Sequence, residues 1–133
     1  MPRLMPRRAA GLLALSLSAL AGAGCGGAHT TAASDRTIDV TLDEYRIVPQ
    51  RISAPAGTLR VVARNTGLLT HNLVIETIPK NPDNPPRRLR QLRTLHAGER
   101  TARSVTLRPG TYRLVCSIAN HETLGQYGTL IVR

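Results

Sequence analysis

Three residue types that can bind a soft metal ion lie close together near the end of the chain. In YRLVCSIANHETLGQYGTLIV, residues 112–132, Cys116, His121 and Gln126 follow one another at intervals of five. His71 lies far upstream, in NTGLLTHNLVI. Two imidazoles and one thiolate with a weak fourth donor form the ligand set of blue-copper electron-transfer sites. We therefore expect these four residues to bind one copper ion per chain.

Short strands must bring His71 to the distant Cys116. Period-two alternation of apolar and polar residues, broken by turn residues, predicts strands over 37–44, 58–65, 71–78, 102–107, 111–117 and 129–133. The segment 47–52 surrounds Pro49 and fits either an edge strand or a bend. Residues 79–90 hold four prolines and predict a loop. Many short strands in about 100 residues favour an all-β fold, an antiparallel sandwich or barrel.

The strand predicted at 111–117 gives Cys116 a direction. Successive side chains alternate between the two faces of a strand, so Tyr112, Leu114 and Cys116 share one face. If Leu114 belongs to the core, Cys116 points inward at the end of the strand. A metal ion bound there would lie under a loop, shielded from bulk water.

The chain resembles the cupredoxins, the plastocyanin and azurin superfamily, over residues 37–133. DEYRIVPQRISAPAGTLRVVARNTGLLTHNLVI is similar to the N-terminal half of that family, and LRPGTYRLVCSIANHETLGQYGTLIV to its C-terminal copper loop. The resemblance implies a Greek-key β-sandwich or barrel and a type 1 copper ion bound by His71, Cys116 and His121. It also implies that Asn72 braces the copper loop by hydrogen bonding.

Gln126 stands where many cupredoxins have methionine. The C-x₄-H-x₄-Q spacing is similar to that of stellacyanins, phytocyanins with an axial glutamine, although the phytocyanin disulfide has no counterpart here. Gln126 is therefore interpreted either as an amide-oxygen ligand or as a lost ligand, and ligation is the preferred interpretation.

The N-terminal segment predicts export. Residues 1–8 carry three arginines, residues 9–24 are apolar or small and uncharged, and Cys25 follows. This is the pattern of a signal peptide, and small residues directly before a cysteine suggest a bacterial lipoprotein acylated at Cys25. We expect a signal over 1–24, a flexible tether over 25–35 and one domain over 36–133. The mature protein would lie at the outer face of the cell membrane or in the periplasm.

Charge and composition limit the partners. The chain has 18 basic and 8 acidic residues, which favours anionic membranes or acidic partners. It has no Phe, no Trp and three Tyr, so platforms for nucleic-acid stacking are lacking and nucleic acid is not expected. We expect a monomer that meets redox proteins and attaches to the membrane through its lipid. The arginines at 87, 88, 90 and 93 form either a solvated loop or a docking patch.

Several alternatives use the same residues. A Cys–His nucleophile pair would need a group to orient the base, and none is evident, so we do not expect an enzyme. A copper carrier or storage protein would have the same fold, but the only methionines are Met1 and Met5. A metal-free cupredoxin-like module and a zinc site remain open. A dinuclear copper site would need a second loop cysteine. His29 and His96 have no partner motif, and we expect both to be solvated.

Overall fold

The regular secondary structure is entirely β-strand in the part of the chain that the structure describes. The structure is a computed structural model that describes residues 29–133; the expected signal and Cys25 lie outside that range. The strands are β1 (Thr31–Ala32), β2 (Thr37–Asp43), β3 (Arg46–Val48), β4 (Arg51–Ala54), β5 (Gly57–Asn65), β6 (Val74–Thr77), β7 (Arg88–Gln91), β8 (Arg100–Leu107), β9 (Gly110–Val115) and β10 (Tyr127–Val132). None of the described residues forms a helix long and apolar enough to cross a membrane. The expected all-β fold is confirmed.

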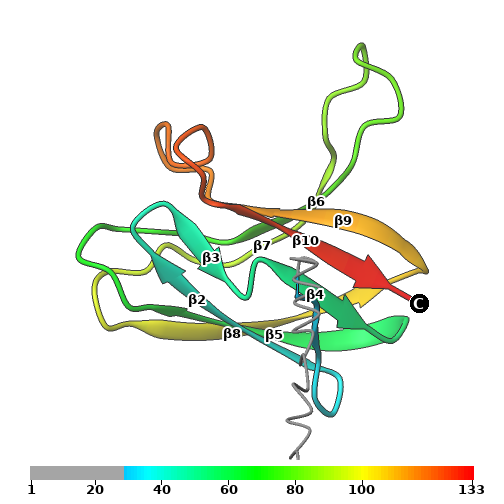
Figure 1. The fold of residues 1–133 in the computed structure, drawn as a ribbon, viewed down its shortest axis with the longest axis horizontal. Coiled ribbons are helices and arrows are strands. Elements are labelled where there is room, and N and C mark those ends of the chain that lie inside the picture. The colour runs from blue at the N-terminus through cyan, green and yellow to red at the C-terminus, as the bar shows by residue number, and fades with distance from the viewer. Residues whose placement is uncertain (1–28) are drawn as a thin grey trace, which may run out of the picture.

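Two sheets face each other across one core (Figure 1). One has six strands in the order β1-β4-β10-β9-β6-β7, and the other has four in the order β3-β2-β5-β8. The inward positions of the strands are apolar, and Leu42, Leu59, Leu114 and Leu130 are fully buried. Burying one such side chain contributes about 1.5–3 kcal/mol, so this core is the main support for the loops at the sandwich ends.

The sheets are mixed rather than antiparallel, which corrects the sequence-based expectation. β2 pairs with β5, β4 with β10, and β1 with β4, all in parallel. The segment 47–52 explains two of these pairings, because the bend at Pro49–Gln50 passes the chain from β3 in one sheet to β4 in the other. Alternation of side chains reports which face is buried, but it does not report which strands pair or in which direction.

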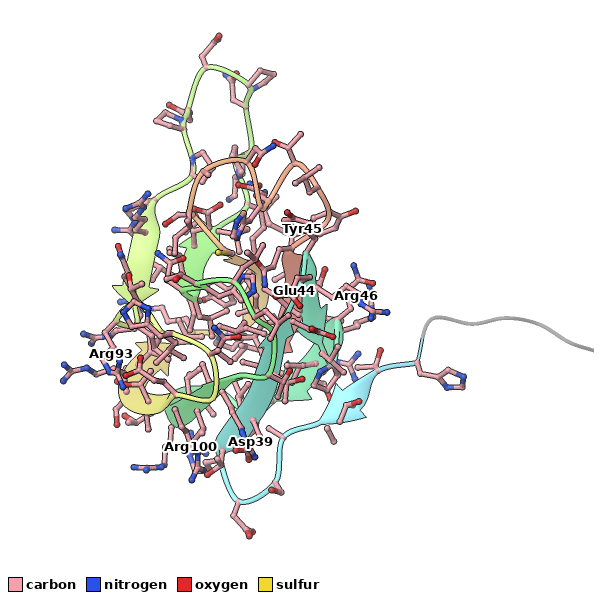
Figure 2. The ribbon with its side chains drawn as sticks, turned by 90° about the vertical axis from the view of Figure 1, so that its left-hand side faces the viewer. Asp39, Glu44, Tyr45, Arg46, Arg93 and Arg100 are labelled. Atoms are coloured by element: carbon pink, nitrogen blue, oxygen red, sulfur yellow. The ribbon has the colours of Figure 1, made fainter. Side chains whose placement is uncertain are left out.

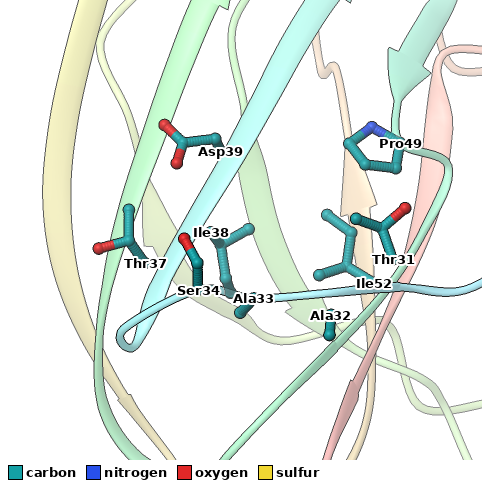
Figure 3. Close-up of a pocket in the computed structure, with 9 residues that line it drawn as sticks. All are labelled: Thr31, Ala32, Ala33, Ser34, Thr37, Ile38, Asp39, Pro49 and Ile52. Atoms are coloured by element: carbon teal, nitrogen blue, oxygen red, sulfur yellow. The ribbon is translucent and has the colours of Figure 1, made fainter.

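Two segments expected to be irregular belong to the sheet. β7 lies at the end of the predicted loop 79–90, where Leu89 is half-buried between exposed arginines. β1 lies within the predicted tether, and Ala33 just after it donates its N–H to the Ser53 carbonyl at 2.8 Å. Figure 3 shows the pocket where this segment meets β2 and β4; Asp39 is the only ionisable group that lines it. Edge strands this short carry too little pattern to be identified from sequence.

Candidate metal centre

The loop 116–126 is closed at its base by the ends of two paired strands. β9 ends at Val115 and β10 begins at Tyr127, and the two strands are antiparallel neighbours. The N–H of Cys116 donates to the Gln126 carbonyl at 3.0 Å, and the N–H of Gln126 donates to the His121 carbonyl at 2.9 Å. The core therefore fixes both ends of the loop, and its internal turns bring His121 back over Cys116.

His71 reaches the same place from a segment that is not a strand. It forms an isolated bridge with Leu95, in which the His71 N–H donates at 3.0 Å and the Leu95 N–H donates back at 2.7 Å. The buried Asn65 shapes the preceding turn, because its amide donates to the carbonyls of Leu69 and Leu95 and accepts the N–H of Gly67. The strand expected from 71 begins only at Val74.

The three strongest donor atoms converge. Nδ1 of His71 lies 3.2 Å from Nδ1 of His121, which lies 3.6 Å from Sγ of Cys116. One ligand atom from each residue falls within 4.8 Å of the others, and all three residues are buried. Metal–nitrogen bonds of about 2.0–2.1 Å and metal–sulfur bonds of about 2.3 Å allow atoms this close to share an ion. His71, Cys116 and His121 thus form a candidate metal site.

Gln126 is fully buried, and its amide orientation is determined by its surroundings. Nε2 donates to the carbonyl of Asp43 at 2.8 Å and to that of Arg46 at 3.3 Å. Both partners can only accept, so this end of the amide must be the NH₂ group. Oε1 is left buried without a hydrogen-bond partner. A buried unpaired acceptor costs about 1–3 kcal/mol, and an ion bound beside it would remove that cost.

The comparisons with known proteins agree with this geometry. The family model described as a cupredoxin-like domain matches residues 10–132. The chain belongs to the cupredoxin-like family. No curated protein sequence matches the chain.

Solved structures show the same cupredoxin-like fold at low sequence identity. A dithionite-reduced auracyanin from Roseiflexus castenholzii has a TM-score of 0.66 and 23% identity, over 76% of this chain and 98% of that one. Auracyanin A from Chloroflexus aurantiacus, a "blue" copper protein, has 0.63 and 17%, over 73% and 98%. Rusticyanin from Thiobacillus ferrooxidans has 0.60 and 20%, over 80% and 83%.

Asn72 links the two ligand-bearing segments of this cupredoxin-like domain. Its side-chain oxygen accepts the N–H of Ser117 at 2.9 Å, and its amide donates to the Ser117 hydroxyl at 3.0 Å. Its own N–H points at Sγ of Cys116, 3.5 Å away. The hydrogen bonding expected of Asn72 is therefore present. Bonds of this kind fix the orientation of metal ligands.

The turn between β2 and β3 contributes contacts that sequence reasoning missed. Oε1 of Glu44 lies 3.6 Å from Nε2 of His71, and the Tyr45 ring packs edge-on against His121 with centroids 5.3 Å apart. Figure 2 shows Glu44, Tyr45 and Arg46 together on this turn. A single sequence holds no signal for them, because the turn lies far from both histidines along the chain.

Glu44 is held by the backbone that leads to His71. Its Oε1 accepts the N–H of Leu68 at 2.7 Å and that of Leu69 at 2.9 Å. The bond from Leu69 is the main reason that the pKa of Glu44 lies below its ordinary value of 4.5. The carboxylate is therefore charged at neutral pH, beside the ring of a candidate ligand.

The remaining histidines and the arginine cluster lie outside the candidate site. His29 and His96 are exposed, and neither belongs to the group of donors around Cys116. The arginines at 87, 88, 90 and 93 are exposed on and around the edge strand β7. Arg93 is paired with Glu99 at 2.9 Å.

Proposed function

We propose that this protein binds one copper ion through His71, Cys116, His121 and Oε1 of Gln126, and that it carries single electrons. The observation that carries the proposal is the buried convergence of two imidazole nitrogens and one sulfur. The unpaired Oε1 of Gln126 supports it with a fourth donor. When bound, copper would supply a one-electron Cu(II)/Cu(I) couple, which thiolate and imidazole ligands suit in both states.

The residues around the site would keep its geometry constant during electron transfer. Cys116 and Gln126 are joined to each other by a backbone hydrogen bond, and Asn72 ties the Cys116 loop to the His71 segment. His71 and Cys116 are fully buried and His121 is 8% exposed, so little water reaches the donors. A site that reorganises little lowers the barrier to gaining or losing an electron.

We place this function outside the cytoplasm, on the sequence pattern of residues 1–35. Residues 1–24 would be removed on export and Cys25 acylated, leaving the domain on the outer face of the membrane or in the periplasm. There it would act as a monomer between redox proteins rather than transform a substrate itself. Mass spectrometry of the membrane fraction tests this: the mature N-terminus should be an acylated Cys25, and an N-terminus that lacks Cys25 or leaves it unmodified would reject lipidation.

Voltammetry with a copper chelator tests the electron-carrier function. The copper-loaded protein should give a reversible one-electron wave and keep its metal through repeated cycles beside a Cu(I) chelator. Loss of Cu(I) to the chelator at each reduction would instead indicate a copper carrier, which would use the same fold and ligands. The appearance of neither a wave nor bound copper would contradict both functions.

A further inference from the structure

The imidazole of His71 is contacted on both of its nitrogen atoms. Nδ1 faces the donor cluster, 3.2 Å from Nδ1 of His121, and Nε2 faces Oε1 of Glu44 at 3.6 Å. His71 is fully buried, and its Nε2 has no hydrogen-bond partner within the usual distance among the described residues. A buried polar atom of this kind needs a partner, and Glu44 is the carboxylate placed to provide one.

The position of the Glu44 carboxylate is enforced by its surroundings. Two backbone N–H groups, from Leu68 and Leu69, hold Oε1 in place. Gly67 lies directly against it, since a Cβ at that position would be 2.3 Å from Oε1. A glycine is thus required for the carboxylate to approach the backbone. An ionised carboxylate has about four acceptor sites on its two oxygens, so capacity remains after the two backbone donors.

The tautomer of His71 follows from this arrangement. An imidazole that binds a metal through Nδ1 carries its proton on Nε2, and the group that accepts this proton sets the tautomer and ring orientation. The separation of 3.6 Å exceeds a normal hydrogen bond, and a rotation that moves the carboxylate by a few tenths of an ångström would close it.

We propose that Glu44 is a positioning residue for the metal ligand His71. This inference rests on the proposed copper function and deepens it. Glu44 accepts the Nε2–H of His71, which keeps the Nδ1 lone pair directed at the metal position. Its negative charge stabilises the more positive, oxidised state of a bound metal ion relative to the reduced state.

Glu99 provides a matched control for Glu44. Its carboxylate also accepts a loop N–H, from His96 at 2.8 Å, and pairs with Arg93. It contacts none of the proposed ligands. Replacing Glu99 by Gln removes one negative charge and one loop clamp, as the corresponding change at Glu44 does, but should leave the environment of His71 intact.

The first measurement uses the metal-free full-length protein. Nitrogen-15 NMR at about pH 8, above the ordinary histidine pKa of about 6.5, reports which ring nitrogen of His71 carries the proton. The wild type and Glu99→Gln should show one Nε2–H tautomer with slow proton exchange. Glu44→Ala should show mixed tautomers and faster exchange, and Glu44→Gln a smaller change of the same kind. A wild-type tautomer and exchange rate in both Glu44 variants would overturn the proposal.

The second measurement is the reduction potential of the copper-loaded proteins. Loss of a ligand's partner typically changes metal affinity 10–100-fold. We expect Glu44→Gln to disfavour Cu(II) relative to Cu(I) about tenfold, which raises the potential by about 59 mV for one electron. Equal potentials for Glu44→Gln and Glu99→Gln would overturn the role of Glu44 and leave the copper function standing. A wild type that binds no copper would contradict the proposed function, while the NMR measurement would still decide the role of Glu44.

Discussion

Two segments meet at the candidate metal centre, and they contribute in opposite ways. The loop 116–126 carries three of the four proposed ligands. The turn 43–46 carries none, yet three of the four ligands contact it. The contacts are Glu44 with His71, Tyr45 with His121, and the carbonyls of Asp43 and Arg46 with Gln126. Figure 1 shows the two segments at the same end of the sandwich.

This difference separates the identity of the ligands from their position. Donor atoms come from side chains whose types and spacing stand in the sequence. Their placement depends on a turn that only the fold brings within reach. Changes in the loop should therefore alter what the metal binds to, and changes around the turn should alter how firmly or in which oxidation state the metal is held.

Gln126 joins the two segments, and its replacement should have the largest of the graded effects. An amide oxygen is a harder donor than a thioether and stabilises Cu(II) more than Cu(I). Gln126→Met should raise the reduction potential by about 100 mV, equivalent to about 2–3 kcal/mol. Voltammetry of the two proteins at one pH measures the shift.

Gln126→Leu is the control for this change, because leucine also loses the hydrogen bonds to Asp43 and Arg46 but offers no donor. If the Met and Leu variants both keep the wild-type potential, Gln126 is not a ligand.

Asn72→Ala should lower the free energy of unfolding by about 1.5 kcal/mol. The change leaves the N–H of Ser117 without its partner, and an unpaired buried donor costs about 1–3 kcal/mol. Urea titration of the metal-free protein measures the loss. Ser117→Ala keeps that backbone bond and should cost less; a larger loss in Ser117→Ala than in Asn72→Ala would contradict the bracing role.

Tyr45→Leu tests the aromatic contact between the turn and the loop. Edge-to-face ring pairs contribute about 0.5–1.5 kcal/mol beyond buried area. The variant should be destabilised by about 1 kcal/mol, and the His121 ring should become more mobile in NMR relaxation. Unchanged relaxation at His121 would show that Tyr45 does not restrain that ligand.

Glu99 should give the smallest effect, because it lies away from both segments. The N–H of His96, followed by Arg93, lowers the pKa of Glu99 below its ordinary value of 4.5. Its contribution to stability is therefore present above about pH 4.5 and is lost as the pH falls through the lower folded-state value. Glu99→Gln should be slightly less stable than the wild type at neutral pH, with the difference vanishing in acid. A difference that does not depend on pH would contradict this origin.

The sequence predicts the donors better than the structure that supports them. Cys116, His121 and Gln126 follow from spacing within one loop, and the all-β fold follows from alternation. The parallel pairing of β2 with β5 could not be predicted, because alternation is the same for either direction of pairing. Glu44 could not be identified either, because its only link to His71 is through space.

The colour of the copper-loaded protein tests the central claim most directly. Cu(II) is titrated into the purified wild type and into Cys116→Ser, with Cys25→Ser as the control for the other thiol. The wild type and the control should take up one equivalent and develop intense visible absorption from the bond between Cu(II) and thiolate. Cys116→Ser should keep its β-rich circular dichroism and lack that absorption. Equal colour in Cys116→Ser, or no uptake by the wild type, would contradict a copper site at His71, Cys116 and His121.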